Sequence, residues 1–336
     1  MAKRNKKKDL QDQALSYLKR AVMDNSEICD NAEKNHKAYM MGKYGNEVEG
    51  RSAFVTSDLA DTVEWIMPGL MRLFYGSQYV FDVQPQGPED EIKSKAMNAK
   101  VNFDFMQMQN GYMVFHDWFK SALLNKTSAV KYWWEEETTR FPKEWEALTE
   151  DEIMALRDDP NFDIEDGEIE LNEDGTFEVS GYKLSTRSYP KCEVLPPEEF
   201  IFEIKSKTDV SEASFVAHKK RVHKNYLKSK YKVADRDLEA LNEEFDNGQE
   251  VEDERFEDLG GTSFLTDDED HNFYFIYECF MNDYDKEGNE VPMKMVILGN
   301  KVIDMEENAY GRPPFCTLSS MWIRTSLPKW VMTVAL

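Results

Sequence analysis

The stretch TSDLADTVEWIMPGLMRLFYG, residues 56–76, reads as one amphipathic helix and sets the helical character of the N-terminal part of the chain. Its apolar side chains recur at spacings of three and four, which places them in one stripe on a helix: Leu59, Val63, Ile66, Leu70 and Leu73. Either Thr56 or Ser57 is expected to cap the helix, and the acids of its first turn favour the positive end of the helix dipole. Pro68 lies inside the pattern and predicts a kink.

Similar patterns surround this helix. Asp9 is the expected N-cap of a preceding helix, and Pro88 stands at the first position of a following one. Apolar periodicity predicts the helices, and β-branched and aromatic residues predict the strands. In chain order we expect a helix at 9–44, a strand at 79–83, helices at 88–111 and 112–125, and a strand at 128–140.

The chain changes character at residues 142–180, which are rich in acids and read as an exposed insertion. A charged helix is expected at 143–160, and two strand-like pieces flank the turn residues 172–175. Strand signals follow at 191–195 and 199–204, a helix near 223–232, and a long hairpin made of 273–281 and 291–303. With no βαβ repeat and no internal period, the fold class is α+β.

The amino-acid composition of the chain limits the kinds of partner that it can bind. The chain has 65 Asp and Glu against 41 Lys and Arg, a net charge of −24, which argues against a simple nucleic-acid-binding surface but not against DNA sliding past. The four cysteines contain no CxxC pair and are expected to be reduced. No apolar run approaches the roughly 20 residues of a membrane helix, and no apolar segment follows the basic start. We expect a soluble, intracellular protein with no membrane partner.

Residues 283–294 resemble a calcium-binding loop. Asp283, Asp285 and Glu287 occupy its first ligand positions, but Lys294 stands where a bidentate carboxylate belongs. Because the flanking segments read as strands, a hairpin turn is the preferred interpretation.

Glu203-Ile204-Lys205 fits the E-x-K pattern of Mg²⁺-dependent nucleases, in which the Glu and an upstream Asp hold the metal. The upstream Asp has no clear candidate, because Asp174 lies in a turn. An amphipathic strand is therefore preferred, and an E-x-K nuclease whose cleavage is lost in Glu203→Ala stays as the enzymatic alternative.

His218 and His223 are five residues apart, which on a helix turns them about 140° from each other and is poor for shared metal ligation. A basic surface segment is the preferred interpretation.

An aromatic cluster could stack nucleotides, but three glutamates follow two of its tryptophans, so packing in a core or interface is preferred. Its members are Tyr132, Trp133, Trp134, Phe141 and Trp145.

Residues 50–136 resemble the N-terminal part of phage portal proteins of short-tailed phages. The shared pattern includes Arg51-Ser52, Asp61–Trp65, Pro68–Met71, Phe74, Gln84-Pro85, Glu89-Asp90, Asn110-Gly111, Asp117-Trp118, Lys131 and Trp134-Glu135. Further similar blocks are 195–202, 213–224, 278–294 and 311–315. The resemblance thus extends over nearly the whole of residues 10–318 and is more specific than any short motif.

The resemblance implies a portal-type wing fold, in which N-terminal helices are followed by a β-rich region with an acidic insertion. It also implies a structural protein that is not an enzyme, with no catalytic, cofactor-binding or metal-binding residues. The expected divisions are a basic disordered tail at 1–8, the helical part of the wing at 9–135, the acidic insertion at 136–190, the β-rich part at 191–318, and an aberrant C-terminal segment at 319–336.

Portal proteins form a twelve-subunit ring at one capsid vertex, through which double-stranded DNA is packaged and ejected. The partners that the resemblance implies are further copies of the chain, the terminase large subunit, the major capsid or scaffold protein, tail or head-completion proteins, and DNA passing non-specifically. The acidic insertion is expected to touch capsid protein. The expected location is the capsid portal vertex of the virion, and the host cytoplasm during assembly.

The segment MWIRTSLPKWVMT, residues 321–333, departs from the family pattern. Met and Trp have single codons, so reading one base out of step forces Val-Asp across Met321–Ile323 and Gly across Trp330–Val331. Synonymous codons allow Pro-His-Lys-Phe between them, as in the family. We therefore expect out-of-frame translation from about residue 321, and a truncated portal without stem, clip and crown that is monomeric or prone to aggregate.

Two alternatives remain besides the nuclease. The C-terminal segment is a genuine docking peptide whose Trp and Leu side chains anchor in a partner groove. The whole chain is an acidic adaptor or DNA-mimic protein, which predicts a monomer that binds a basic partner tightly.

Overall fold

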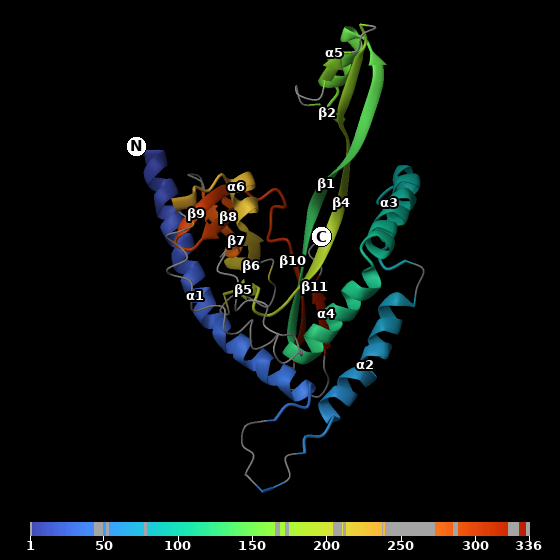
Figure 1. Ribbon diagram of the computed structural model, residues 1–336. Helices are drawn as coiled ribbons and strands as arrows, with labels where there is room; N and C mark the ends of the chain where they lie inside the picture. Colours follow the sequence, from blue (N-terminus) through green and yellow to red (C-terminus); the bar gives the residue numbers. More distant parts are fainter. Residues whose placement is uncertain are drawn as a thin grey trace. The chain divides into compact units, whose positions relative to one another are not determined.

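The computed structural model describes residues 2–43, 50–51, 54–76, 79–164, 169–171, 175–203, 210, 213–236, 238, 273–284, 288–321 and 329–333. The chain forms two compact units: unit 1 is Met1–Tyr132 with Cys192–Leu336, and unit 2 is Trp133–Lys191. Figure 1 shows the elements of both units. Helices and antiparallel sheets both contribute, so the α+β fold class predicted from the sequence is confirmed.

Unit 1 begins with four helices. They are α1 (Ala2–Tyr39), α2 (Asp58–Tyr75), α3 (Glu91–Phe103) and α4 (Gly111–Asn125). A 3₁₀ turn, η1 (Pro88–Asp90), precedes α3, and a π-helical turn, η2 (Asp104–Met108), follows it. Asn110 is left-handed at φ 52°, and a Cβ at Gly111 would lie 2.6 Å from the Phe105 ring. The Asn-Gly pair therefore permits the sharp junction at which α4 starts.

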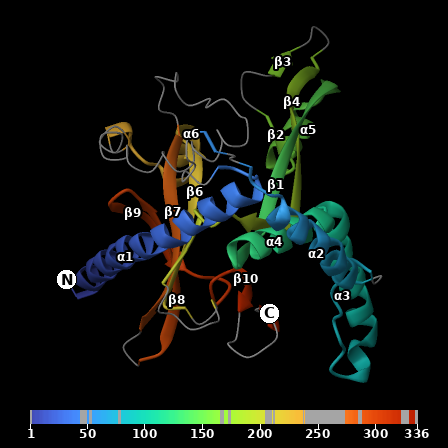
Figure 2. The same cartoon turned by 90° about the horizontal axis from the view of Figure 1, so that it is seen from below.

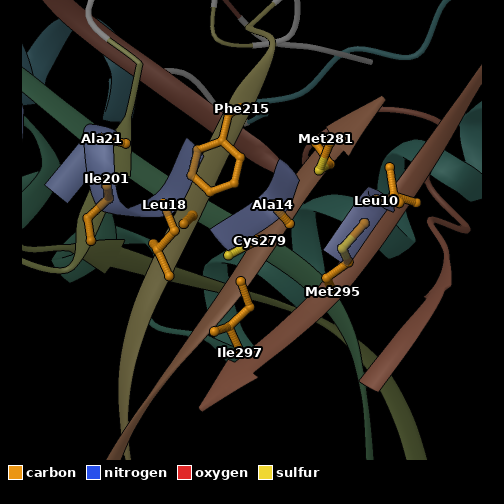
Figure 3. Close-up of a cluster of buried hydrophobic side chains, with 11 residues drawn as sticks. Leu10, Ala14, Leu18, Ala21, Ile201, Phe215, Cys279, Met281, Met295 and Ile297 are labelled. Carbon is orange, nitrogen blue, oxygen red and sulfur yellow. The ribbon is translucent and has the colours of Figure 1, made fainter. Parts of the chain in front are cut away.

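A five-stranded antiparallel sheet in the order β5-β6-β7-β8-β9 forms a second layer of unit 1. Its strands are β5 (Phe200–Phe202), β6 (Phe215–His223), β7 (Phe273–Tyr284), β8 (Glu290–Leu298) and β9 (Lys301–Glu307), and α6 (Lys224–Tyr231) follows β6. Helix α1 packs along this sheet (Figures 1 and 2). The shared core is labelled in Figure 3 and contains Leu10, Ala14, Leu18 and Ala21 of α1 against Ile201, Phe215, Cys279, Met281, Met295 and Ile297.

A second core of unit 1 lies between α2, α4 and two strands. Strand β10 (Phe315–Met321) pairs antiparallel with the start of β1 (Thr127–Leu148), where Val130 lies opposite Cys316, and with β11 (Lys329–Thr333). The side chains of this core are largely aromatic and sulfur-containing, and Val63, Met67, Met71, Phe105, Phe115, Trp118 and Phe119 are among them.

Unit 2 is built on the remainder of β1 and most of β4 (Phe177–Leu195). Strands β2 (Phe162–Asp163) and β3 (Ile169–Leu171) both pair antiparallel with β4. The helix α5 (Glu150–Asp158) starts with a capping box, in which the Glu152 carboxylate accepts from the Thr149 backbone N–H at 2.9 Å.

Two local expectations are wrong. Residues 2–8, expected as a disordered tail, belong to α1, because Ala, Lys and Arg are strong helix formers and no Pro or Gly occurs before Gly42. Residues 143–148, expected in a helix, continue β1, because the capping box delays the helix to Glu150 and Trp145 packs edge-on against Phe162 in the extended chain.

Residues 79–83, expected as a strand, pair with no strand among the described residues; side chains of α3 hold their backbone instead. Asn102 Oδ1 accepts from the N–H groups of Val80 (2.8 Å) and Phe81 (3.1 Å), and its Nδ2 donates to the Phe81 carbonyl (2.9 Å). Asn98 Oδ1 accepts from Val83 N–H at 2.6 Å. Two asparagines one helical turn apart thus take the place of a neighbouring strand.

Candidate functional site

The calcium-like segment is a hairpin turn. Strands β7 and β8 pair from Ile276 opposite Leu298 to Tyr284 opposite Glu290, and Gly288 has a φ of 86° in the turn. Asp285 and Glu287 lie outside the described residues. The preference for a hairpin over a calcium loop is confirmed by this pairing.

Only the first residue of the E-x-K segment lies in the part of the chain that is described. Glu203 directly follows β5, and its Oε1 lies 3.9 Å from an Arg20 guanidinium nitrogen on α1. Ile204, Lys205 and Asp174 lie outside the described residues. Among the residues with described positions, no three His, Cys, Asp or Glu side chains are grouped to hold a metal ion.

Both histidines lie on strand β6 rather than on a helix. His223 caps α6, where its Nδ1 accepts from the Asn225 backbone N–H at 3.1 Å. His218 is only 2% exposed, so the expected basic surface segment is wrong for this residue. This segment forms a strand because the β-branched residues Val216 and Val222, both buried, favour an extended chain.

His218 belongs to a buried cluster of charged side chains within unit 1. Lys131 on β1 donates to the Glu278 carboxylate on β7, and its Nζ lies 2.9 Å from His218 Nδ1. His218 Nε2 lies 3.5 Å from the Glu199 carboxylate. An ammonium can only donate, so Nδ1 accepts and the ring proton is on Nε2, toward Glu199. The cluster thus joins β1 to the β5–β9 sheet through complementary donors and acceptors.

The ionisation of Glu278 follows from its partners. Burial by itself raises the pKa of this carboxyl group, but the charge of Lys131 and the hydrogen bond that it donates outweigh burial and hold the pKa well below its usual range. Glu278 is therefore ionised at neutral pH, which suits a structural ion pair and not a general acid.

The five aromatic residues of the cluster predicted from the sequence differ in their surroundings. Tyr132 packs edge-on against Tyr310 in unit 1. In unit 2, Trp133 lies under Lys191, Trp145 packs on Phe162, and Trp134 is 55% exposed. Packing roles are described for Tyr132, Trp133 and Trp145.

Helix α2 exposes a second apolar face. Val63, Met67 and Met71 are buried, whereas Leu59, Ile66 and Leu73 recur every seven residues beside them and are exposed, with Leu73 at 77%. The single stripe expected from the sequence is therefore split between core and surface. Trp65 is 89% exposed. Ser57 is the N-cap residue of α2, as one of the two expected, but its hydroxyl donates to the Asp61 carboxylate and makes no capping hydrogen bond.

Helix α3 has a similar unpaired face. Ile92, Ala96, Ala99 and Phe103 follow the i, i+4, i+7, i+11 spacing of one helical stripe, and all are exposed, with Ile92 at 84%. Asn98 and Asn102 lie on the other side and hold residues 79–83. In both views α2 and α3 lie on the same side of unit 1, away from the β5–β9 sheet (Figures 1 and 2). Exposed apolar faces of this kind are typical of protein–protein contacts.

Unit 2 concentrates negative charge. Residues 133–191 contain 18 Asp and Glu against 6 Lys and Arg, a net charge of −12, which is half of the net charge of the chain. The part of β1 that belongs to this unit is exposed over most of its length.

Sequence reasoning missed two of these features. The helical spacing of apolar residues in the sequence is sufficient to predict the stripe on α3. No pattern in the sequence predicts the Lys131–Glu278 pair, because its members are 147 residues apart.

Comparison with known proteins identifies one family. The sequence model of the family described as "Phage SU10 portal protein" matches residues 13–327. No curated protein matches the chain. Within the described residues, no helix is long and apolar enough to span a membrane.

Proposed function

Because the chain belongs to the phage SU10 portal protein family, we propose that it is a subunit of the portal ring through which double-stranded DNA enters and leaves the capsid. The match over residues 13–327 carries this proposal. Portal proteins are structural and not enzymatic, and we propose the same for this chain. The proposed location is the capsid vertex.

A closed ring needs two different, complementary patches on each subunit, because neighbouring copies meet head to tail. The exposed faces of α2 and α3 are apolar surfaces that a neighbouring copy would cover, and Leu73 and Ile92 are their most exposed members. We assign one side of the subunit contact to these faces.

The charge of the chain suits the passage of DNA. A protein that neutralises many phosphates releases counterions and binds DNA tightly, which would hinder movement. With a net charge of −24, the subunit supplies few such contacts. The proposed contact with DNA is therefore weak and independent of base sequence.

The other partners follow from the proposed place in the particle. They are the terminase large subunit during packaging, the major capsid or scaffold protein around the ring, and tail or head-completion proteins afterwards. We propose that the acidic unit 2 meets capsid protein, because its exposed part of β1 and its negative charge offer a surface that is distinct from the apolar faces of unit 1.

We propose that residues from about 321 are read out of frame. Sequencing the gene decides this, since only certain codons spell Val-Asp-Pro-His-Lys-Phe in the shifted frame.

Electron microscopy tests the ring. The product of the shifted frame should form closed rings of twelve subunits. Monomers alone from a well-folded product of that frame would contradict the proposed assembly.

A further inference from the structure

A cavity of about 390 Å³ in unit 1 lies between α1, α4 and the segment 194–198. Each helix contributes one face: Cys29, Ala32, Glu33 and His36 from α1, and Asp117, Lys120, Ser121 and Leu124 from α4. Both sets have the i, i+3, i+4, i+7 spacing of a single helix stripe. The cavity is therefore a trough between two facing helices.

Two asparagines of α1 fix the width of this trough. Asn25 Nδ2 donates to the Pro197 carbonyl at 3.2 Å, and Asn35 Nδ2 donates to the Leu124 carbonyl at 2.9 Å. Ten residues of helix span about 15 Å, so α1 is attached on both sides of the cavity and bridges it. The trough is thus held open by the fold.

The walls and rim of the trough differ in character. Ala32, Leu124 and the run from Val194 to Pro197 supply apolar wall, whereas Glu33, Asp117 and Glu198 supply carboxylates. Glu33 and Asp117 are exposed, which places these two toward solvent. The lysine of the lining is already engaged, because Lys120 Nζ lies 2.9 Å from a Glu64 carboxylate oxygen and 5.1 Å from the Tyr39 ring centre. The site therefore suits an apolar chain that ends in a positive charge.

One buried acceptor beside the trough has no donor among the described residues. Asn25 is 4% exposed, and no residue with a described position donates to its Oδ1, although its Nδ2 bonds to Pro197 and also reaches Cys29 Sγ at 3.5 Å. Both of these partners line the cavity. An unsatisfied buried acceptor is costly, and this one lies one helical turn from Cys29, which lines the cavity.

We propose that this trough is a docking site for a lysine or arginine side chain presented by a partner protein. The alkyl stem of such a side chain lies against the apolar walls while its head meets carboxylates at the rim, as long basic side chains do elsewhere. The volume lies at the lower end of the range for ligand sites. A free diamine is disfavoured, because its second charge would be buried against the apolar wall. The inference does not rest on the portal assignment.

The alkylation rate of Cys29 reports whether the trough is occupied. It is a half-buried free thiol in the lining, and burial raises its pKa, so it is alkylated slowly and at mildly alkaline pH. The test measures the alkylation rate of Cys29 by peptide mapping in the full chain, with half-buried Cys316 as an internal reference. The probes are n-pentylammonium, n-pentanol, pentanoate and 1,5-diaminopentane.

Pentylammonium should slow the alkylation of Cys29 severalfold without affecting Cys316, and it should act at concentrations about tenfold lower than pentanol, since one charge-assisted contact is worth roughly that factor. Pentanoate should give no protection. Equal protection by pentanol, stronger protection by the diamine, or no protection by pentylammonium would each overturn the proposal.

A matched pair of variants separates binding from folding. Glu33→Gln removes a rim carboxylate and should cancel the advantage of pentylammonium over pentanol. Glu27→Gln removes an exposed carboxylate of the same helix outside the lining and should leave that advantage intact. Melting temperatures of both variants should match that of the unchanged protein. An undiminished advantage in folded Glu33→Gln would contradict the assigned rim.

Discussion

Lys131 on β1 donates a hydrogen bond to Glu278 on β7, and only 9% and 11% of their side-chain surfaces remain exposed. The pair connects the strand that pairs with β10 to the β5–β9 sheet, and His218 completes its hydrogen bonding. A buried pair of this kind is costly to break from one side, because the remaining charge has no counterpart.

Lys131→Met should therefore lower the free energy of unfolding by about 3–5 kcal/mol. Adding Glu278→Gln should recover part of this loss, since the uncompensated carboxylate is gone. Denaturant titration measures both values. As a control, Lys294→Met breaks the more exposed Lys294–Glu306 pair and should cost less than about 1 kcal/mol. Equal losses at the two sites would contradict the buried role of Lys131.

The same pair predicts a pH dependence. The folded-state pKa of Glu278 lies below the unfolded value of about 4.3. Between these two pKa values the folded state binds fewer protons, so its stability is present above the unfolded pKa and is lost as pH falls through the folded pKa. Unfolding free energies measured downward from pH 5 should decline more steeply for the unchanged protein than for Glu278→Gln. Parallel curves would show that Glu278 is not held ionised.

Asn102→Ala should detach residues 80 and 81 from α3. Two backbone N–H groups and one carbonyl lose their partner, which should cost about 1–3 kcal/mol. Hydrogen exchange at Val80 and Phe81 should accelerate selectively. Lys95→Ala changes an exposed residue of the same helix and should leave these amides protected. Unchanged exchange in Asn102→Ala would disprove the strand-like role of this side chain.

Ile92→Asp should weaken self-association in the ring-forming product, because it places a charge in the exposed stripe of α3. Met97→Asp makes the same kind of change on another face of α3 and serves as the control. Sedimentation velocity should show smaller species for Ile92→Asp only, at unchanged melting temperature. If both variants assemble normally, the stripe is not a subunit contact.

The local sequence pattern is sufficient to predict the helices and strands whose apolar residues follow a single regular spacing. The helix expected at 56–76 occurs at Asp58–Tyr75, and the expected hairpin forms between β7 and β8. Its second arm, expected to run to residue 303, ends at Leu298 and turns back into β9 at Lys301. Periodicity identified the apolar residues of α2 but could not tell which of them a neighbour covers. Val63 is in the core while Leu73 is not, and that choice depends on where α4 packs.

Long-range polar contacts were beyond local pattern. The spacing from His223 alone predicts a helix face for His218, yet the environment of His218 is set by Lys131, 87 residues away. In the same way, nothing near residues 79–83 indicates that Asn98 and Asn102 satisfy their backbone. Such contacts become visible only when the chain is folded.

Immunogold electron microscopy of phage particles tests the central claim most directly. Antibodies raised against unit 2, residues 133–191, recognise the protein whichever reading frame follows residue 321. On particles opened by osmotic shock, the account predicts gold at a single vertex, where the tail attaches. Gold spread over all vertices, or absent from particles in which the protein is detected by mass spectrometry, would contradict it.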